Sequence, residues 1–124
     1  MNEDIHVEFE GKYKGINYLG TWHDGILGLQ EMPMLGDMYK GWRCGYVEIP
    51  KAHPWYKKPY MEINVDCHGG LTFGDKIPIK AGWFVGFDCN HYYDTPESCP
   101  KEYVERECKY IIDQLLEVES VNNI

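Results

Sequence analysis

The sequence predicts an α+β fold, with an antiparallel β-sheet of short strands packed by one C-terminal amphipathic helix. Three observations lead to this prediction. Short apolar-alternating runs recur as far as residue 87, glycines and prolines separate them, and one stretch with helical spacing follows near the C-terminus. Strands followed by a closing helix are typical of α+β domains. The length of 124 residues is near the commonest domain size, so we expect a single domain over residues 1–124.

The expected strands occupy residues 5–9, 43–49, 61–67, 70–73 and 82–87. The clearest pattern is in 61–67, where apolar and polar residues alternate as in a strand with one buried face. Residues 11–30 contain five glycines, which predicts short strands or loops there. Residues 32–38, with three methionines, are expected to form a loop.

The C-terminal helix is predicted from apolar residues at spacings of 4, 3 and 4, which share one face: Val104, Cys108, Ile111 and Leu115. Either Ser98, or Thr95 followed by Pro96, is expected to cap the start of this helix. The apolar stripe should then lie on the sheet, and the glutamate-rich face should point to water.

Composition and charge exclude several classes of protein. A net charge of −8 disfavours binding to duplex nucleic acid, which depends on neutralising phosphates with lysine and arginine. No stretch approaches the roughly 18 apolar residues of a membrane span, and the N-terminus has no signal-peptide pattern. Five cysteines without a C-x-x-C pair indicate reduced thiols, so we expect a cytoplasmic protein that does not contact a membrane.

The densest polar stretch lies at the end of the expected strand 61–67 and reads Asp66-Cys67-His68-Gly69-Gly70-Leu71-Thr72-Phe73. Two glycines after a histidine allow positive φ angles and close approach of a ligand to the main chain. One interpretation is therefore a ligand-contacting turn in which His68 is a donor, base or metal ligand. The other is a tight turn between two strands, since Gly-Gly is a common hairpin signal.

A second polar stretch places Asp88, His91 and Asp94 at intervals of three residues after the expected strand 82–87. Carboxylates with an imidazole suit either a metal or acid–base chemistry. The alternative is that both aspartates cap turns and that His91 is merely exposed. The sequence does not choose between these interpretations.

A zinc site can be assembled from Cys67, His68, Cys89 and His91, but it lacks the usual pair spacings of zinc ligands. Cys67 and His68 are also adjacent, so in a strand they would point to opposite faces. We therefore predict no metal and no cofactor, and buried, inert cysteines rather than a cysteine nucleophile. The sequence assigns no catalytic residue, because it contains no motif of the common nucleotide-hydrolase, dinucleotide-binding, α/β-hydrolase or zincin classes.

Residues 50–60 form the one basic and aromatic stretch in this acidic chain, with three lysines and no acid. Lys51, His53 and Tyr56 would suit a ligand with a base to stack and phosphates to pair, because aromatic side chains and cations provide those two interactions. The alternative is a proline-rich crossover whose lysines are solvated. Its three prolines favour a fixed, extended loop in either case.

Four runs together resemble a group of small bacteriophage and prophage proteins without an established function: Gly45-Tyr46-Val47, Pro50-Lys51-x-His53-Pro54-x-Tyr56, His68-Gly69-Gly70-Leu71-Thr72-Phe73 and Trp83-Phe84-x-Gly86-Phe87-Asp88-Cys89-x-His91. The resemblance covers about residues 42–94. It implies a virus-encoded protein that acts in the cytoplasm of a host bacterium. Some phage proteins of this size sequester nucleotide immune signals, and that analogy is one of context.

The favoured hypothesis is a phage-encoded protein that binds a small polar ligand, such as a host nucleotide immune signal, between loops 50–60, 68–73 and 88–94. The expected ligand contacts are Lys51, His53, Tyr56, His68, Gly69, Gly70, Thr72, Asp88 and His91. One alternative is a hydrolase of a small phosphorylated ligand, in which His68, Asp88, His91 and Asp94 bind a metal or act as acid and base. Another is an acidic protein–protein inhibitor of a host factor. Whether the chain forms a homo-oligomer stays open.

Overall fold

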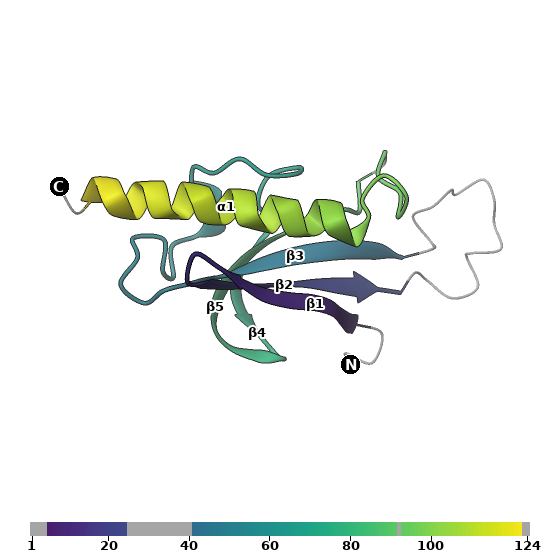
Figure 1. Ribbon diagram of the computed structural model, residues 1–124, viewed down its shortest axis with the longest axis horizontal. Coiled ribbons are helices and arrows are strands. Elements are labelled where there is room, and N and C mark those ends of the chain that lie inside the picture. The colour runs from purple at the N-terminus through teal and green to yellow at the C-terminus, as the bar shows by residue number, and fades with distance from the viewer. Residues whose placement is uncertain (1–4, 25–40, 92, 123–124) are drawn as a thin grey trace.

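The computed structural model describes residues 5–24, 41–91 and 93–122. Over these residues it contains a five-stranded antiparallel sheet and one C-terminal α-helix (Figure 1), which confirms the α+β prediction. The expected loop at residues 32–38 lies outside the described residues. Within them, no helix has both the length and the apolar character needed to cross a membrane.

The sheet has the strand order β1-β2-β3-β5-β4, and every neighbouring pair is antiparallel. The strands are β1 (Ile5–Tyr13), β2 (Ile16–His23), β3 (Trp42–Ile49), β4 (Phe73–Ile77) and β5 (Lys80–Asp88). The expected strands 5–9, 43–49 and 82–87 are thus confirmed as parts of β1, β3 and β5. The β1–β2 hairpin turns on Lys14 and Gly15, which both have positive φ (51° and 85°), as two-residue hairpin turns require.

The expected strand at 61–67 is wrong, and its predicted buried face is confirmed only from Ile63 onward, because Met61 is 79% exposed. Ile63 is buried and Val65 and Cys67 pack against the core, but the segment pairs with no strand. Its backbone is satisfied by side chains of the helix instead. The amide of Asp66 donates to Gln114 Oε1, and Gln114 Nε2 donates back to the Asp66 carbonyl, both at 2.8 Å.

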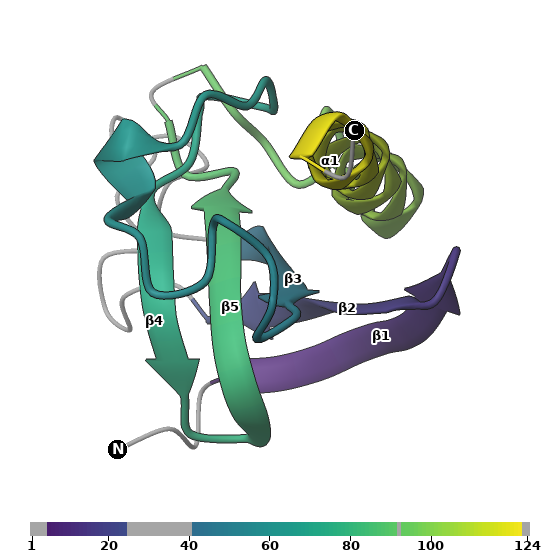
Figure 2. The same ribbon diagram turned by 90° about the vertical axis from the view of Figure 1, so that its left-hand side faces the viewer.

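Two neighbouring segments also differ from expectation. Tyr60–Glu62 forms a short 3₁₀ helix, and residues 70–72 precede β4 rather than forming a strand of their own. The chain between β3 and β4 is therefore mostly a long, extended crossover. It lies beside the helix, as Figure 2 shows.

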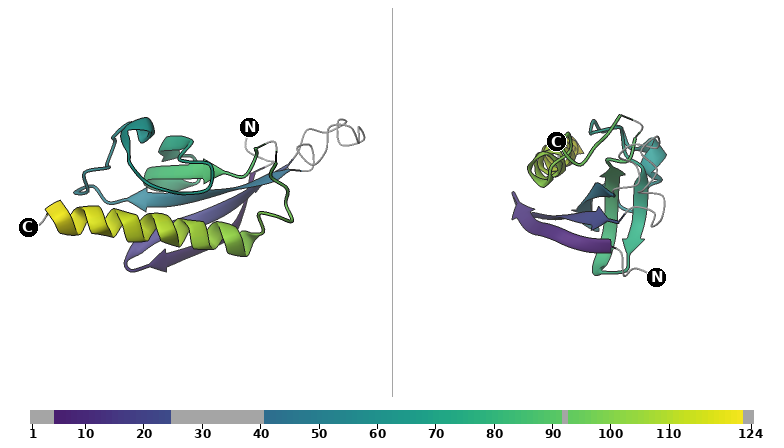
Figure 3. Two further views of the ribbon diagram at one scale, coloured as in Figure 1. Left: turned by 90° about the horizontal axis from the view of Figure 1, so that it is seen from above. Right: turned by 90° about the vertical axis from the view of Figure 1, so that its right-hand side faces the viewer.

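The helix α1 (Lys101–Asn122) covers one face of the sheet, and the left view in Figure 3 shows it running along the length of the molecule. The predicted stripe is fully buried: Val104, Cys108, Ile111 and Leu115 each have 0% exposure. Val47 and Val85 form the sheet side of this core, also at 0%. A Cβ at Gly45 would lie 2.8 Å from Cys108 Sγ, so glycine allows the helix to approach β3 closely.

The opposite face of the sheet is also buried in places, because the sheet curls strongly. In Figure 2, β4 and β5 stand steeply against β1 and β2. The start of β5 meets β1, where Lys80 Nζ lies 2.6 Å from Glu10 Oε1. This curl encloses Leu19 and Phe84, which are 2% and 1% exposed.

The helix is preceded by a tight turn at 95–99, which contains the two predicted capping residues. The Thr95 amide donates to Ser98 Oγ at 3.0 Å, and the Ser98 amide donates to Thr95 Oγ1 at 2.9 Å. This reciprocal arrangement resembles a capping box. It ends at Ser98, three residues before the helix begins at Lys101.

Candidate functional site

The structure brings His68 and His91 together through Asp94. His68 lies in the crossover between β3 and β4, whereas His91 and Asp94 follow β5. His68 Nε2 lies 3.0 Å from both carboxylate oxygens of Asp94, and His91 Nδ1 lies 2.6 Å from Asp94 Oδ2. The Asp94 side chain is only 3% exposed, so the two histidines are its main partners. Of the polar residues predicted around loops 68–73 and 88–94, these three converge.

Gly69 and Gly70 shape the turn that carries His68. Their φ angles are +67° and +81°, a region that strains other residues. A Cβ on Gly69 would lie 2.4 Å from Cε1 of His91, so a side chain there would collide with the imidazole. The Gly70 amide donates to the Cys67 carbonyl at 2.9 Å and closes the turn.

Two buried cysteines complete this group. Cys99 Sγ lies 3.9 Å from His68 Nε2 and 3.8 Å from Asp94 Oδ1. His68, Cys89 and Cys99 offer one nitrogen and two sulfur atoms, all within 4.8 Å of one another. We call His68, Cys89, His91, Asp94 and Cys99 the His–Cys cluster.

The four residues considered for zinc from the sequence, Cys67, His68, Cys89 and His91, are not the set that the structure brings together. Cys67 packs against the core instead, and Cys99 occupies the place expected for it. Burial raises the pKa of both Cys89 and Cys99, because a buried thiolate loses its hydration. Without a metal, both cysteines are therefore neutral thiols at pH 7.

The cluster does not have the geometry of a nucleophilic Cys–His–Asp triad. In such a triad the acid holds one ring nitrogen of the histidine, and the other nitrogen takes the proton of the nucleophile. Here Cys99 and Asp94 both face Nε2 of His68, while Nδ1 lies 2.8 Å from the hydroxyl of Tyr103. Nε2 donates to the carboxylate, so it cannot also accept a proton from the thiol.

Hydrogen bonds lower the pKa of Asp94 within this cluster. Burial alone acts to raise it, but hydrogen bonds from His68 and His91 outweigh burial and leave the pKa below its ordinary value. Burial also raises the pKa of Tyr103 to about 12, which keeps its hydroxyl protonated beside His68. The cluster is thus a buried carboxylate held by two imidazoles, with two neutral thiols beside it.

His53 does not join the cluster, and the structure gives it a different role from the predicted one. It is 3% exposed, its Nε2 lies 2.8 Å from the carbonyl oxygen of Leu115, and its Nδ1 accepts the Trp55 amide at 3.0 Å. Both ring nitrogens are engaged, so His53 fixes its loop to the helix. Leu115 lies twelve residues beyond Tyr103, or about 18 Å along the helix axis. Loop 50–60 is therefore fixed to a different part of the helix, and the three loops do not form the single expected pocket.

Lys51 and Tyr56, from the same loop, line a separate cavity of about 320 Å³. Lys76 of β4 and Trp83 of β5 line it too, and the rings of Tyr56 and Trp83 lie 6.3 Å apart. We call this the lysine–aromatic cavity. Its remaining lining residues are Glu48, Ala81 and Gly82.

Few of the polar side chains around this cavity form ion pairs or hydrogen bonds with one another. Among the described residues, neither Lys51 nor Lys76 forms an ion pair through its ammonium group. Trp83 Nε1 is buried and has no hydrogen-bond acceptor in the described part of the chain. Glu48 accepts a hydrogen bond from Asn17 at 3.1 Å. The cavity therefore presents two cations, one carboxylate and two aromatic rings.

Two further predicted contacts lie in neither site. Asp88 Oδ1 accepts the amide of Asn90 at 3.1 Å, which supports the alternative that Asp88 caps a turn. The Thr72 side chain is exposed, and its amide donates to the Gly86 carbonyl at 2.9 Å. Both residues have local structural contacts.

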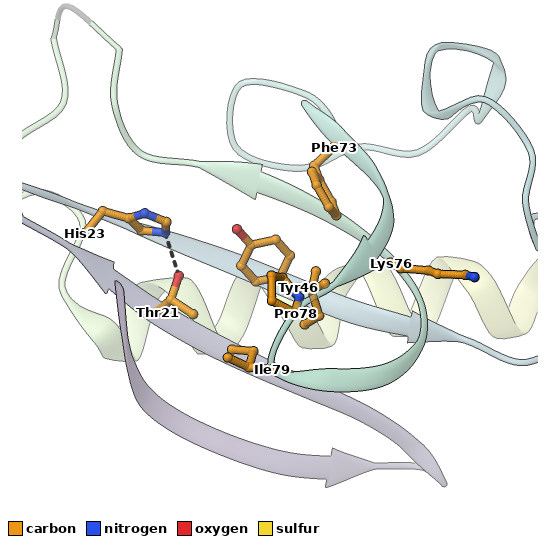
Figure 4. Close-up of a pocket in the computed structure, with 8 residues that line it drawn as sticks. Thr21, His23, Tyr46, Phe73, Lys76, Pro78 and Ile79 are labelled. Atoms are coloured by element: carbon orange, nitrogen blue, oxygen red, sulfur yellow. Dashed lines mark hydrogen bonds between the residues drawn. The ribbon is translucent and has the colours of Figure 1, made fainter. Parts of the chain in front are cut away.

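A more apolar cavity, of about 200 Å³, lies inside the curl of the sheet (Figure 4). Thr21 Oγ1 and His23 Nε2 lie 2.9 Å apart beside this cavity and form a hydrogen bond with each other. Lys76 also lines it, but Figure 4 shows its side chain pointing away from the other labelled residues. Its remaining lining residues are Tyr46, Phe73, Ile77, Pro78 and Ile79.

The sequence did not indicate Cys99 of the His–Cys cluster or its neighbour Tyr103. It also did not indicate Lys76 and Trp83 at the lysine–aromatic cavity. Cys99 stands ten residues after Cys89, a spacing that matches no metal-ligand pattern. Lys76 lies in a hairpin, where a lone lysine is ordinarily solvated. Only the register of β4 and β5 could have placed Lys76 and Trp83 at the cavity, and only the turn at 95–99 brings Cys99 beside His68.

Comparisons with protein-family models, with curated proteins and with solved structures gave no match. The evidence for function therefore comes from the residues and the geometry of this chain.

Proposed function

We propose that this chain is a ligand-binding protein, and that its lysine–aromatic cavity takes a small ligand with an aromatic ring and phosphate groups, such as a nucleotide. One observation carries the proposal. Two lysines and two aromatic residues from three separate elements meet at one cavity of about 320 Å³, in a chain whose net charge is −8. That volume lies at the lower end of the range of about 300–1,000 Å³ for small-molecule sites.

The chemistry of the lining matches the parts of a nucleotide. Tyr56 and Trp83 offer faces on which a base can stack, worth roughly 1–3 kcal/mol per base where it has been measured. Lys51 and Lys76 offer ammonium groups for phosphate oxygens, and Glu48 suits a ribose hydroxyl.

The setting we propose follows from the resemblance to phage proteins. A phage-encoded protein in the host cytoplasm would gain from sequestering a nucleotide immune signal, and a sponge needs binding without turnover. Binding is favoured over hydrolysis because His68, His91 and Asp94 do not line this cavity. A ligand held there would lack the acid–base residues that the hydrolase hypothesis requires.

The test is native mass spectrometry of the purified protein with a panel of linear nucleotides, cyclic dinucleotides and ADP-ribose, followed by calorimetric titration of each nucleotide retained. We expect a retained, chemically unchanged nucleotide. The double variant Lys51→Ala/Lys76→Ala should bind it about 10- to 100-fold more weakly, which corresponds to about 1.4–2.8 kcal/mol.

The matched control is Lys12→Ala, which removes an exposed lysine of β1 that lines none of the cavities described above. It should bind the nucleotide as the wild type does. Equal binding by the double variant would refute the cavity as the site, and an empty protein across the whole panel would refute the function. Conversion of the nucleotide into products would favour the hydrolase.

A further inference from the structure

The second feature with a ligand chemistry of its own is the His–Cys cluster, which is separate from the lysine–aromatic cavity. We propose that His68, Cys89, Cys99 and Asp94 bind one zinc ion, which fastens the turn at 68–70, the end of β5 and the turn before α1 to one another. The inference is independent of the proposed ligand.

The spacing of the donor atoms fits a tetrahedral ion. Zinc lies about 2.3 Å from sulfur and about 2.0–2.2 Å from nitrogen or oxygen, so neighbouring ligand atoms lie roughly 3.3–3.8 Å apart. Cys99 Sγ lies 3.9 Å from His68 Nε2 and 3.8 Å from Asp94 Oδ1. Cys89 Sγ lies within 4.8 Å of the donor atoms of both His68 and Cys99, so these three residues already lie close enough for one ion. Asp94 Oδ1, 3.8 Å from Cys99 Sγ, supplies the fourth ligand that we propose.

The surrounding residues orient the ligands as second-sphere partners do in metal sites. If His68 binds through Nε2, its Nδ1 carries the proton and donates to the hydroxyl of Tyr103, 2.8 Å away. His91 Nδ1 lies 2.6 Å from Asp94 Oδ2, which leaves Oδ1 for the metal. The His91 amide also donates to Oδ2 at 3.0 Å, so the carboxylate has a fixed orientation.

The donor set selects the metal. Two thiolates with an imidazole suit zinc, whereas magnesium and calcium take oxygen ligands. Four protein ligands leave no open position for water, which is the pattern of a structural rather than a catalytic zinc. On binding, Zn²⁺ replaces the protons of both thiols, and these protons are released to solvent.

Two segments that are distant from His68 in the sequence meet at this cluster. Cys89 follows the last residue of β5, and residues 95–99 form the turn before the helix. Arg43 Nη1 donates to the carbonyls of Pro96 and Cys99, at 3.2 Å each, and so holds this turn against β3. A zinc ion would add a second link, between this turn, the end of β5 and His68.

The experiment is metal analysis of the full chain purified without chelators, with cobalt substitution of the metal-free protein as a second readout. We expect about one zinc ion per chain and, with Co²⁺, a thiolate-to-cobalt charge-transfer band. Cys99→Ser should weaken zinc binding more than about 100-fold, and Tyr103→Phe, which keeps all four ligands, by about 10- to 100-fold. Cys67→Ser is the matched control, because Cys67 lies beside His68 in sequence but outside the cluster, and it should bind zinc as the wild type does.

Two outcomes would overturn the proposal. The first is wild-type protein that carries no zinc and shows no thiolate band with Co²⁺, which would leave a metal-free network of hydrogen bonds. The second is undiminished binding in both Cys99→Ser and Tyr103→Phe. Because Tyr103→Phe removes only a hydroxyl, it keeps the test valid if Cys99→Ser fails to fold.

Discussion

The His–Cys cluster and the lysine–aromatic cavity are both built from loop and strand-end residues, but their polar atoms are satisfied in opposite ways. In the cluster, Asp94 is buried and accepts hydrogen bonds from two histidines. At the cavity, Lys51 and Lys76 are exposed and form no ion pair with another described residue. Buried polar groups that satisfy one another hold a fold together, whereas exposed cations beside a hollow are free to bind an anionic ligand.

The largest expected effect is the loss of charge at Asp94. Asp94→Asn removes the carboxylate that both imidazoles share, and breaking a buried, hydrogen-bonded pair is costly. We expect the free energy of unfolding to fall by about 3 kcal/mol, measured by urea denaturation. Nucleotide binding at the cavity should persist in the folded fraction.

Asp113→Asn is the control for this change. Asp113 pairs with Lys14 at 2.9 Å, but both side chains are about half exposed, so the loss should be below about 1 kcal/mol. If Asp94→Asn and Asp113→Asn lower the free energy of unfolding equally, the buried cluster stabilises the fold no more than an exposed ion pair does.

An intermediate effect is expected at His53, because the structure makes it a link between its loop and the helix. His53→Ala leaves the Leu115 carbonyl and the Trp55 amide without their partner, at a cost of about 1–3 kcal/mol. Ligand affinity should stay within about twofold of the wild type in calorimetric titration. His6→Ala, which removes an exposed imidazole paired with Asp24, is the control and should change stability by less than about 1 kcal/mol. A His53→Ala protein of normal stability that no longer binds would restore the sequence-based role of His53 as a ligand contact.

The smallest expected effect on stability is at Trp83. Trp83→Phe removes an indole N–H that has no partner in the described residues, so the lost ring area is partly offset and the net change should stay within about 1 kcal/mol. Ligand affinity should fall about three- to tenfold. Trp22→Phe provides the contrast, since that indole donates to Asp24 at 3.1 Å and lines none of the described cavities. If Trp83→Phe binds the ligand as tightly as the wild type does, Trp83 does not contribute to the proposed site.

The sequence predicted the strands and the helix where periodicity was local, but it could not predict what each face would meet. In residues 62–67 the alternation of more and less buried side chains was correct, but Met61 is exposed, and the hydrogen-bonding partner is Gln114, far along the chain. Periodicity reports burial, and it does not distinguish a neighbouring strand from a helix side chain.

The candidate sites show the same limit. His68 and His91 were selected because histidines beside glycines and acids stand out in a sequence. Cys99 could not be selected, because only the turn at 95–99 brings it back to His68. Lys51 and Tyr56 were chosen for composition, and the register of β4 and β5 added Lys76 and Trp83.

We propose that the lysine–aromatic cavity binds a nucleotide and that the His–Cys cluster stabilises the fold. The most direct measurement is thermal unfolding with and without each nucleotide of the panel, on the wild type, Lys51→Ala/Lys76→Ala and Tyr103→Phe. Ligand that binds only the folded state raises the unfolding temperature. At one fixed nucleotide concentration we predict this rise in the wild type and in Tyr103→Phe, whose baseline is lower, and a much smaller rise in the double-lysine variant, whose baseline is normal. A rise that is undiminished without the two lysines, or that disappears in Tyr103→Phe, would contradict the account.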